Sequence, residues 1–260
     1  MSEGPVRIER EGDVAVVTFD HPPVNLWDVS LAKAFSETLD ALESNSPRAV
    51  LFRAEGRVVS GGVDVQEFAD AESVEGAESL FDDLIAFTQR VEALPCPTVW
   101  ASHALTLTWA MEIALGCDLI VAADDCLFGL VEARIGLTPA MGGTQRLAAR
   151  AGDGRAREFV MLAEPVPAAT LYEWGVINRL VPAGEVDSVA RALAAQLGSG
   201  PTLAHVATKT ILRAARDGGP AAADAVTSRV AAELFSTEDL QGGVRSFLDE
   251  GFGKARFSGR

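Results

Sequence analysis

The chain has 260 residues, 48% of them apolar, enough for a sizeable core in one large domain or in a core with an appendage. Its formal net charge of −15 opposes nucleic-acid binding, because the phosphates would be repelled. No run approaches the roughly 18 apolar residues of a membrane span, and no basic segment followed by an apolar one opens the chain. We therefore expect a soluble cytoplasmic protein with no membrane partner.

Metal and nucleotide motifs are missing from the sequence. The three histidines form no metal-binding spacing, and we expect no metal site. The cysteines lie in apolar surroundings, which favours buried free thiols at Cys96, Cys117 and Cys126. Neither a GxxxxGK[ST] phosphate loop nor a GxGxxG fingerprint is present, so nicotinamide, flavin and ATP chemistries have no support.

Strands and helices alternate at short intervals from the start of the chain. The apolar periodicity predicts strands at 14–19, 49–52, 98–101 and 118–122, and helices at 31–42, at 80–94 and around Glu112. Ser30 is the expected cap of the first helix. This rhythm is strand–strand–helix rather than a series of βαβ units, and it predicts an α/β fold.

Long helices dominate the last third of the chain. They are expected at 186–197, 202–216 and 221–234, with Gly218-Gly219-Pro220 separating the last two. We divide the chain into a core at 1–195 and a C-terminal helical region at 196–260. The alanine-rich stretch 221–232 would leave apolar faces exposed on a monomer, which favours an oligomer.

Glu112 is the one polar side chain in the helix-like run 109–115. A carboxylate is among the groups least often buried without a partner. The positive end of the helix dipole would keep Glu112 ionised and would suit a developing oxyanion. In the alternative interpretation, the stem of Glu112 packs while its head reaches solvent.

Glu132 is a second lone carboxylate, twenty positions further on. Two carboxylates behind glycine-rich turns suggest a general acid and a general base. A structural partner for Glu132, such as Arg134 or Arg146, would explain it equally well. The segment 142–146 (GGTQR) is typical of a turn into a helix, where bulky residues are excluded because chains cross.

The glycine pair in residues 60–64 (SGGVD) allows positive φ, so backbone N–H groups can converge on a ligand. Taken alone, this segment is more often an ordinary turn, since glycine pairs are common in turns. One N–H from this turn and one from the start of the Glu112 helix would form an oxyanion hole for a polarised carbonyl.

Several ordered motifs together resemble the enoyl-CoA hydratase/isomerase family, also called the crotonase family, over essentially the whole chain. The matching segments are 21–25 (HPPVN), 60–64, 112–118 (EIALGCD), 132–139 (EARIGLTP), 142–147 (GGTQRL), 175–178 (GVIN), Lys209 and 257–259 (FSG).

The resemblance implies a crotonase-like spiral of strand–strand–helix repeats with a C-terminal helical region for trimerisation. The partners would be an acyl-CoA thioester and further copies of the chain, in a homotrimer or a dimer of trimers. Coenzyme A would be part of the substrate, so no separate cofactor is expected. The implied setting is fatty acid metabolism.

The same resemblance implies roles for particular residues. Glu112 and Glu132 would be catalytic, and the N–H groups of Val63 and Trp109 would form the oxyanion hole. The substrate-binding residues would be Asn25, Leu26, Ser60, Gly61, Gly62, Asp64, Val65 and Gly136.

A pair of glutamates favours hydration of a 2-enoyl-CoA. Glu112 would deprotonate a water that adds to C3, and Glu132 would hold the same water and deliver a proton to C2. Two alternatives stay open: an acyl-CoA-binding protein with weak or no hydratase activity, and another reaction of the family, such as isomerisation, thioester hydrolysis or C–C cleavage.

Thr108-Trp109-Ala110 stands where the family has three glycines. A glycine with positive φ that is replaced by Thr or Trp becomes strained, by about 1–3 kcal/mol. The Trp109 indole either enters the acyl pocket, which it would shorten or close, or points into the core, which requires the backbone to shift.

Overall fold

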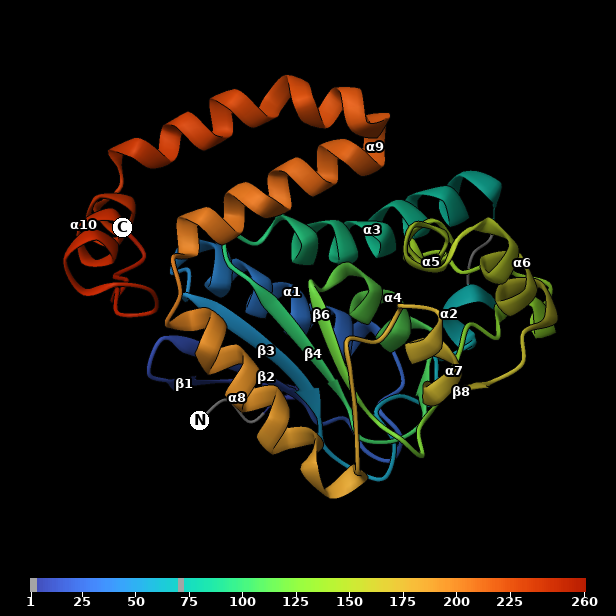
Figure 1. Ribbon diagram of the computed structural model, residues 1–260. Coiled ribbons are helices and arrows are strands. Elements are labelled where there is room, and N and C mark those ends of the chain that lie inside the picture. Colours follow the sequence, from blue (N-terminus) through green and yellow to red (C-terminus); the bar gives the residue numbers. More distant parts are fainter. Residues whose placement is uncertain (1–3, 70–72) are drawn as a thin grey trace.

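A computed structural model describes residues 4–69 and 73–260, and a mostly parallel sheet lies at its centre (Figure 1). The strands, in spatial order, are β1 (Val6–Glu11), β2 (Val14–Phe19), β3 (Ala49–Ala54), β4 (Thr98–Ser102), β6 (Leu119–Ala123) and β9 (Arg179–Val181). β1 pairs antiparallel with β2, and every later pair is parallel. β2 and most of β3 are buried, as expected for strands covered on both faces.

A second, small sheet runs beside the first. It consists of β5 (Thr106–Leu107), β7 (Leu127–Gly129) and β8 (Val166–Pro167). β5 follows β4 and precedes a helix, and β7 follows β6, so these two successive turns of the chain each supply one strand to each sheet. The predicted strand–strand–helix rhythm is confirmed, and the fold is the crotonase-like spiral expected from the resemblance.

Helices cover both faces of the central sheet (Figure 1). Helix α8 lies on one face, and α1 and α3 lie on the other. The helices are α1 (Val29–Ser44), α2 (Gln66–Ala69), α3 (Val74–Ala93), α4 (Trp109–Gly116), α5 (Gly143–Ala151), α6 (Asp153–Leu162), α7 (Ala168–Glu173) and α8 (Val186–Gly198), followed by α9 (Thr202–Glu233) and α10 (Glu238–Glu250).

The predicted cap of the first helix is wrong. Asp28 is the N-cap of α1, and its Oδ1 accepts a hydrogen bond from the Leu31 N–H at 2.8 Å. Ser30 lies within the first turn, because the helix begins at Val29. Carboxylates and hydroxyls both cap helices well, so composition alone did not separate the two candidates.

The C-terminal helices fold back on themselves, as the glycine-proline break predicted. Gly219 has φ 75° and ψ −177°, and Pro220 follows it inside α9. The two halves of α9 form a hairpin above α3, and α10 and the C-terminus lie beside its open end (Figure 1). The boundary placed between residues 195 and 196 falls inside α8, and this division into two domains stays a prediction.

Helix α4 is the element that carries the site into the core. All eight of its residues are buried, including Glu112, which is 2% exposed. The three cysteines are also buried and unpaired with one another, as expected. No helix in the described ranges is long and apolar enough to cross a membrane.

Candidate active site

Both predicted catalytic carboxylates line one cavity of about 200 Å³. Its walls come from the loop 61–65, the start of α4, the 3₁₀ helix Glu132–Ile135 and the loop 137–141. Most of the lining is apolar, with side chains such as Leu84 and Leu137. A small apolar cavity with two carboxyl groups is the arrangement expected of acid–base chemistry on a small acyl group.

The head of Glu112 is held by the backbone. Its Oε2 accepts hydrogen bonds from the N–H groups of Met141, at 2.9 Å, and of Gly143, at 2.7 Å. A Cβ added at Gly143 would lie 2.7 Å from Glu112 Cγ, so a glycine is required for this close approach. The alternative in which the Glu112 head reaches solvent is therefore wrong.

Glu132 is held far less tightly. Its side chain is 9% exposed, and its Oε2 has no hydrogen-bond partner among the described residues. The two candidate structural partners act elsewhere: Arg134 donates to the Ala163 carbonyl at 2.8 Å, and Arg146 pairs with Glu92 at 2.6 Å. Because a buried carboxyl oxygen without a partner is costly, this atom is suited to bind a ligand or water.

Burial raises the pKa of both carboxyl groups toward neutrality. Burial, followed by the charge of Glu132, raises the pKa of Glu112 to about 8, while the N–H groups of Gly143 and Met141 act in the opposite direction. Burial raises the pKa of Glu132 to about 7. Both groups therefore titrate closer to neutral pH than an exposed glutamate does, and the charge of Glu132 opposes the ionisation of Glu112.

A buried arginine lies behind the loop that holds Glu112. Arg146 is 7% exposed, donates from Nη1 to the Gly142 carbonyl at 3.1 Å, and pairs through Nη2 with Glu92. It fixes the turn that presents the Met141 and Gly143 N–H groups. The sequence showed this turn only as a place where bulky residues are excluded, and it did not indicate that its N–H groups bind Glu112.

The two predicted oxyanion-hole segments lie side by side. Ser60 forms a parallel bridge with Thr106, and the Leu107 N–H donates to the Ser60 carbonyl at 3.3 Å. The N–H of Val63 and that of Trp109, the first residue of α4, are free of hydrogen bonds to other described residues. Free N–H groups at a helix start and in a glycine turn can both serve an oxyanion.

The Trp109 indole points into the core. It is fully buried, its Nε1 donates to the Asn25 carbonyl at 3.0 Å, and its ring centroid lies 5.0 Å from that of Phe19 and 5.5 Å from that of Trp27. The indole is not part of the cavity lining, so it does not close the cavity. Of the two alternatives, the core orientation is the observed one.

The expected backbone strain falls on Thr108 alone. Trp109 has helical geometry as the first residue of α4, whereas Thr108 has φ 48° and ψ −116°. A β-branched residue rarely adopts positive φ, and glycine is favoured there. The shift that admits the indole to the core is thus accommodated by one strained residue.

The other predicted site residues divide into two groups. Gly61, Gly62, Val63 and Val65 line the cavity together with the two glutamates. The predicted residues outside its lining are Asn25, Leu26, Ser60, Asp64, Trp109 and Gly136. All of these substrate contacts stay predictions.

Three residues of the second group hold backbone in place. The Asn25 amide donates to the Glu55 carbonyl at 2.9 Å, and the Ser60 hydroxyl accepts from the Gly62 N–H at 3.0 Å. Gly136 ends the 3₁₀ helix of Glu132 in the left-handed conformation. Each of them thereby shapes a segment that borders the cavity.

Sequence reasoning missed several residues of the cavity wall. They are Phe68, Leu84, Thr108, Val131, Arg134, Ile135, Leu137, Thr138, Ala140 and Met141. Four of them, Arg134, Ile135, Leu137 and Thr138, belong to the motif 132–139, but which side chains face the cavity depends on loop geometry that periodicity does not reveal. Thr108 was noted for strain and not for its hydroxyl.

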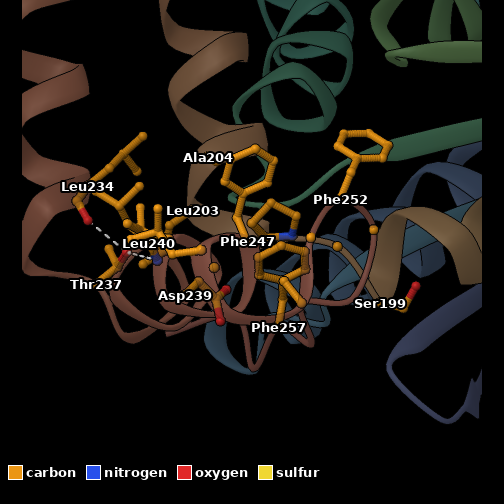
Figure 2. Close-up of a pocket in the computed structure, with 18 residues that line it drawn as sticks. Ser199, Leu203, Ala204, Leu234, Thr237, Asp239, Leu240, Phe247, Phe252 and Phe257 are labelled. Atoms are coloured by element: carbon orange, nitrogen blue, oxygen red, sulfur yellow. Dashed lines mark hydrogen bonds between the residues drawn. The ribbon is translucent and has the colours of Figure 1, made fainter.

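A larger cavity lies elsewhere in the described part of the chain. It measures about 680 Å³ and lies between the start of α9, α10 and the C-terminal tail (Figure 2). Phe247 and Phe257 line it, and its one carboxylate, Asp239, accepts hydrogen bonds from the Ser258 and Gly259 N–H groups. This apolar cavity lacks a pair of titratable groups, so we place the chemistry at the glutamates.

Within residues 4–69 and 73–260, no three His, Cys, Asp or Glu side chains lie close enough together to hold a metal ion. The absence of a metal and of a separate cofactor remains a prediction from the sequence.

Comparison with protein families gives a match over nearly the whole chain. The model of the enoyl-CoA hydratase/isomerase family matches residues 9–259. A probable enoyl-CoA hydratase of Bacillus subtilis is 28% identical over 239 residues, which are 91% of this chain and 93% of that protein. The short-chain-enoyl-CoA hydratase of Clostridium acetobutylicum is 29% identical over 248 residues, covering 94% and 95% of the two chains.

Solved structures agree with these sequence matches. The crystal structure of an enoyl-CoA hydratase subunit I from Geobacillus kaustophilus superposes with a TM-score of 0.92 at 29% identity and covers 100% of both chains. A structural match of this extent and identity covers the spiral core and the C-terminal helices alike.

Proposed function

Because this chain belongs to the enoyl-CoA hydratase/isomerase family, we propose that its cavity adds water across the C2–C3 double bond of a 2-enoyl-CoA thioester. The observation that carries the proposal is the buried pair Glu112 and Glu132, facing one cavity and titrating near neutral pH. An acid and a base with pKa values near the working pH are what water addition requires.

The first step is polarisation of the thioester carbonyl. The free N–H groups of Val63 and Trp109 donate to its oxygen, and electron density moves from the double bond toward that oxygen. C3 becomes electrophilic as a result. Such a donor contributes about 10²–10³ in rate, because it is fixed before charge develops.

Glu112 is the general base of the proposed mechanism. The N–H groups of Met141 and Gly143 stabilise the ionised form of Glu112, the form that can act as a base. Glu112 takes a proton from water as the oxygen attacks C3. Glu132, with its unpartnered Oε2, holds the same water and delivers a proton to C2.

An acyl-CoA-binding protein of weak activity is the second candidate. The strain at Thr108 favours it, since the oxyanion-hole segment departs there from its usual glycine. The position of the Trp109 ring argues against it, because the cavity is left open. Isomerisation, thioester hydrolysis and C–C cleavage are further family reactions that product analysis distinguishes.

The test is turnover of crotonyl-CoA and of longer 2-enoyl-CoAs, followed by loss of the conjugated thioester absorbance and by identification of the 3-hydroxyacyl product. We expect hydration by the wild-type protein and a severe loss in Glu132→Gln. Tight calorimetric binding without turnover supports the binding protein instead. A rate that Glu132→Gln leaves unchanged excludes the proposed role of the pair.

We also propose a homotrimer or a dimer of trimers. The C-terminal region exposes large apolar side chains: Phe247 is 58%, Leu248 75% and Phe252 91% exposed. A contiguous apolar surface of this kind is typical of a covered interface. Light scattering at micromolar concentration should give a multiple of three chains, and a monomer would contradict the proposal.

A cytoplasmic location is proposed on the three buried free cysteines, since thiols persist in a reducing compartment. The acyl-CoA substrate further suggests fatty acid metabolism. Cell fractionation with an antibody to the protein tests the location.

A further inference from the structure

Thr108 has two energetically unfavourable features: a strained backbone and a buried hydroxyl without a hydrogen-bond partner in the described part of the chain. Its backbone is strained at φ 48°, where glycine is preferred. Its side chain is 5% exposed, and Oγ1 has no hydrogen-bond partner among the described residues. A strained residue with an unpaired buried hydroxyl persists where function requires it, and the inference runs from this outlier to its role.

Thr108 lines the reaction cavity and lies against the glycine loop. Thr108 is part of the cavity lining together with Glu112, Glu132 and Gly62. Its Oγ1 lies 3.6 Å from the position that a Cβ on Gly62 would occupy. The side chain therefore projects from the start of α4 toward the glycine loop, across the corner of the cavity where the two segments meet.

This corner is the proposed place of the thioester oxygen. Gly62 immediately precedes Val63, and Thr108 immediately precedes Trp109, so the contact between Gly62 and Thr108 joins the two segments that carry the free N–H groups. A threonine hydroxyl rotates freely and has one O–H to donate. Because this O–H has no partner among the described residues, it is available to an oxygen bound beside Gly62 and Thr108.

We propose that Thr108 Oγ1 is a third hydrogen-bond donor to the thioester carbonyl oxygen, beside the N–H groups of Val63 and Trp109. This inference rests on the proposed function of the cavity as an acyl-CoA site. The O–H pairs with the oxygen only when substrate is bound, and the bond strengthens as negative charge develops there. Thr108 would then be a catalytic residue, because it supplies an O–H donor that a glycine at the same position lacks.

The direct test is kinetic and uses isosteric replacement. Thr108→Val keeps the β-branched shape and removes the O–H, and Thr108→Ser keeps the O–H. We expect kcat for crotonyl-CoA to fall about 10²-fold in Thr108→Val, with KM changed less than threefold, and to stay within about threefold of wild type in Thr108→Ser. Thr108→Gly relieves the strain but should remain as slow as Thr108→Val.

A second readout measures how well the site stabilises an oxyanion when no hydration takes place. Acetoacetyl-CoA loses its C2 proton to solvent and forms an enolate that absorbs in the near ultraviolet, and donors at the oxygen stabilise this enolate. Thr108→Val should raise the apparent pKa of the bound ligand, with about a tenfold loss of enolate at fixed pH, whereas Thr108→Ser should not.

Thr88→Val is the matched control. Thr88 is fully buried on α3, its Oγ1 also lacks a partner among the described residues, and it packs against Gly116 rather than the cavity. Removing this hydroxyl should leave both readouts at wild-type values. An effect of Thr88→Val as large as that of Thr108→Val would assign both to packing and overturn the inference.

The outcomes separate the two proposals. If wild type hydrates crotonyl-CoA and Thr108→Val matches it in both readouts, the third donor is wrong and the proposed function stands. If wild type forms the bound enolate in a Thr108-dependent way but hydrates no enoyl-CoA, the hydratase proposal fails and the third donor stands. If acetoacetyl-CoA does not bind to wild type, both are overturned.

Discussion

Glu112 and Glu132 share one cavity but are held in opposite ways. Glu112 is clamped by two backbone N–H groups on a turn that Arg146 braces. Glu132 lies on a short 3₁₀ helix, and its Oε2 has no partner among the described residues. One carboxylate is thus held by the backbone alone, and the other leaves an oxygen available to the proposed substrate or its water.

This difference indicates how one cavity can hold an acid and a base of the same residue type. Burial raises the pKa of both groups, to about 8 for Glu112 and to about 7 for Glu132. Two N–H donors from the loop oppose this rise at Glu112, whereas at Glu132 only its own backbone N–H opposes it. The chemical roles are set by the surroundings rather than by the side chains. The following experiments test that division, beginning with the largest expected effect.

Glu112→Gln should cause the largest loss. The amide oxygen can still accept from the Met141 and Gly143 N–H groups, so the fold is preserved while the base is removed. We expect kcat for crotonyl-CoA to fall about 10³–10⁴-fold with unchanged substrate affinity. More than a tenth of the wild-type rate in this variant would show that Glu112 is not the base.

Glu132→Gln should cost somewhat less. The amide keeps a hydrogen bond to the attacking water but cannot deliver the proton as a carboxylic acid does. We expect kcat to fall about 10²–10³-fold under the same conditions, which is a smaller loss than in Glu112→Gln. A larger loss here than in Glu112→Gln would reverse the assigned roles.

Two glycine substitutions compare the turn that holds Glu112 with the end of the 3₁₀ helix that carries Glu132. Gly143→Ala puts a Cβ 2.7 Å from Glu112 Cγ, so the clamp must open, and kcat should fall at least about tenfold. Gly136→Ala meets no atom within 4 Å but has φ 81°, so it should cost about 1–3 kcal/mol in unfolding free energy with kcat nearly unchanged. Urea unfolding and turnover separate the two effects, and equal losses of activity would contradict the comparison.

The smallest effect is a pH dependence of stability. Both carboxyl groups have folded pKa values, about 8 and about 7, above the ordinary 4.5, so the folded protein binds more protons than the unfolded chain between pH 4.5 and 8. Their contribution to stability is therefore fully present below about pH 4.5 and is lost as the pH rises through 7 and 8.

Urea unfolding of wild type and of the double variant Glu112→Gln/Glu132→Gln at pH 5 and pH 8 measures this contribution. The double variant should gain stability relative to wild type on going from pH 5 to pH 8, because amides do not ionise. The same difference at both pH values would show that the carboxyl groups titrate normally in the folded protein.

The fold could be predicted from the sequence to a large extent, because its signals are local. The apolar run 14–19 matches β2 at both ends, and the Gly218-Gly219-Pro220 break divides α9 as expected. The first helix was found, but its cap was not, since Asp28 and Ser30 are both good capping residues and lie two positions apart.

The two carboxylates of the candidate site could be predicted from the sequence, but the groups that surround them could not. Glu112 and Glu132 were visible as lone charges in apolar segments. The donors to Glu112 are backbone N–H groups from a loop about thirty residues away, and backbone groups leave no trace in residue type. The direction of the Trp109 ring also depended on space beside Phe19 and Trp27, which only the packed core defines.

The aromatic cluster around Trp109 has an optical consequence. Three of the four tryptophans, Trp27, Trp100 and Trp109, lie in one group, with centroid distances of 5.5 Å and 6.4 Å from the Trp109 ring. Excitation energy absorbed by any of them can pass to its neighbours, so much of the intrinsic emission comes from directly behind the oxyanion-hole segment. Intrinsic tryptophan fluorescence should therefore serve as a label-free signal of acyl-CoA binding, with Trp109→Phe as the variant that weakens it.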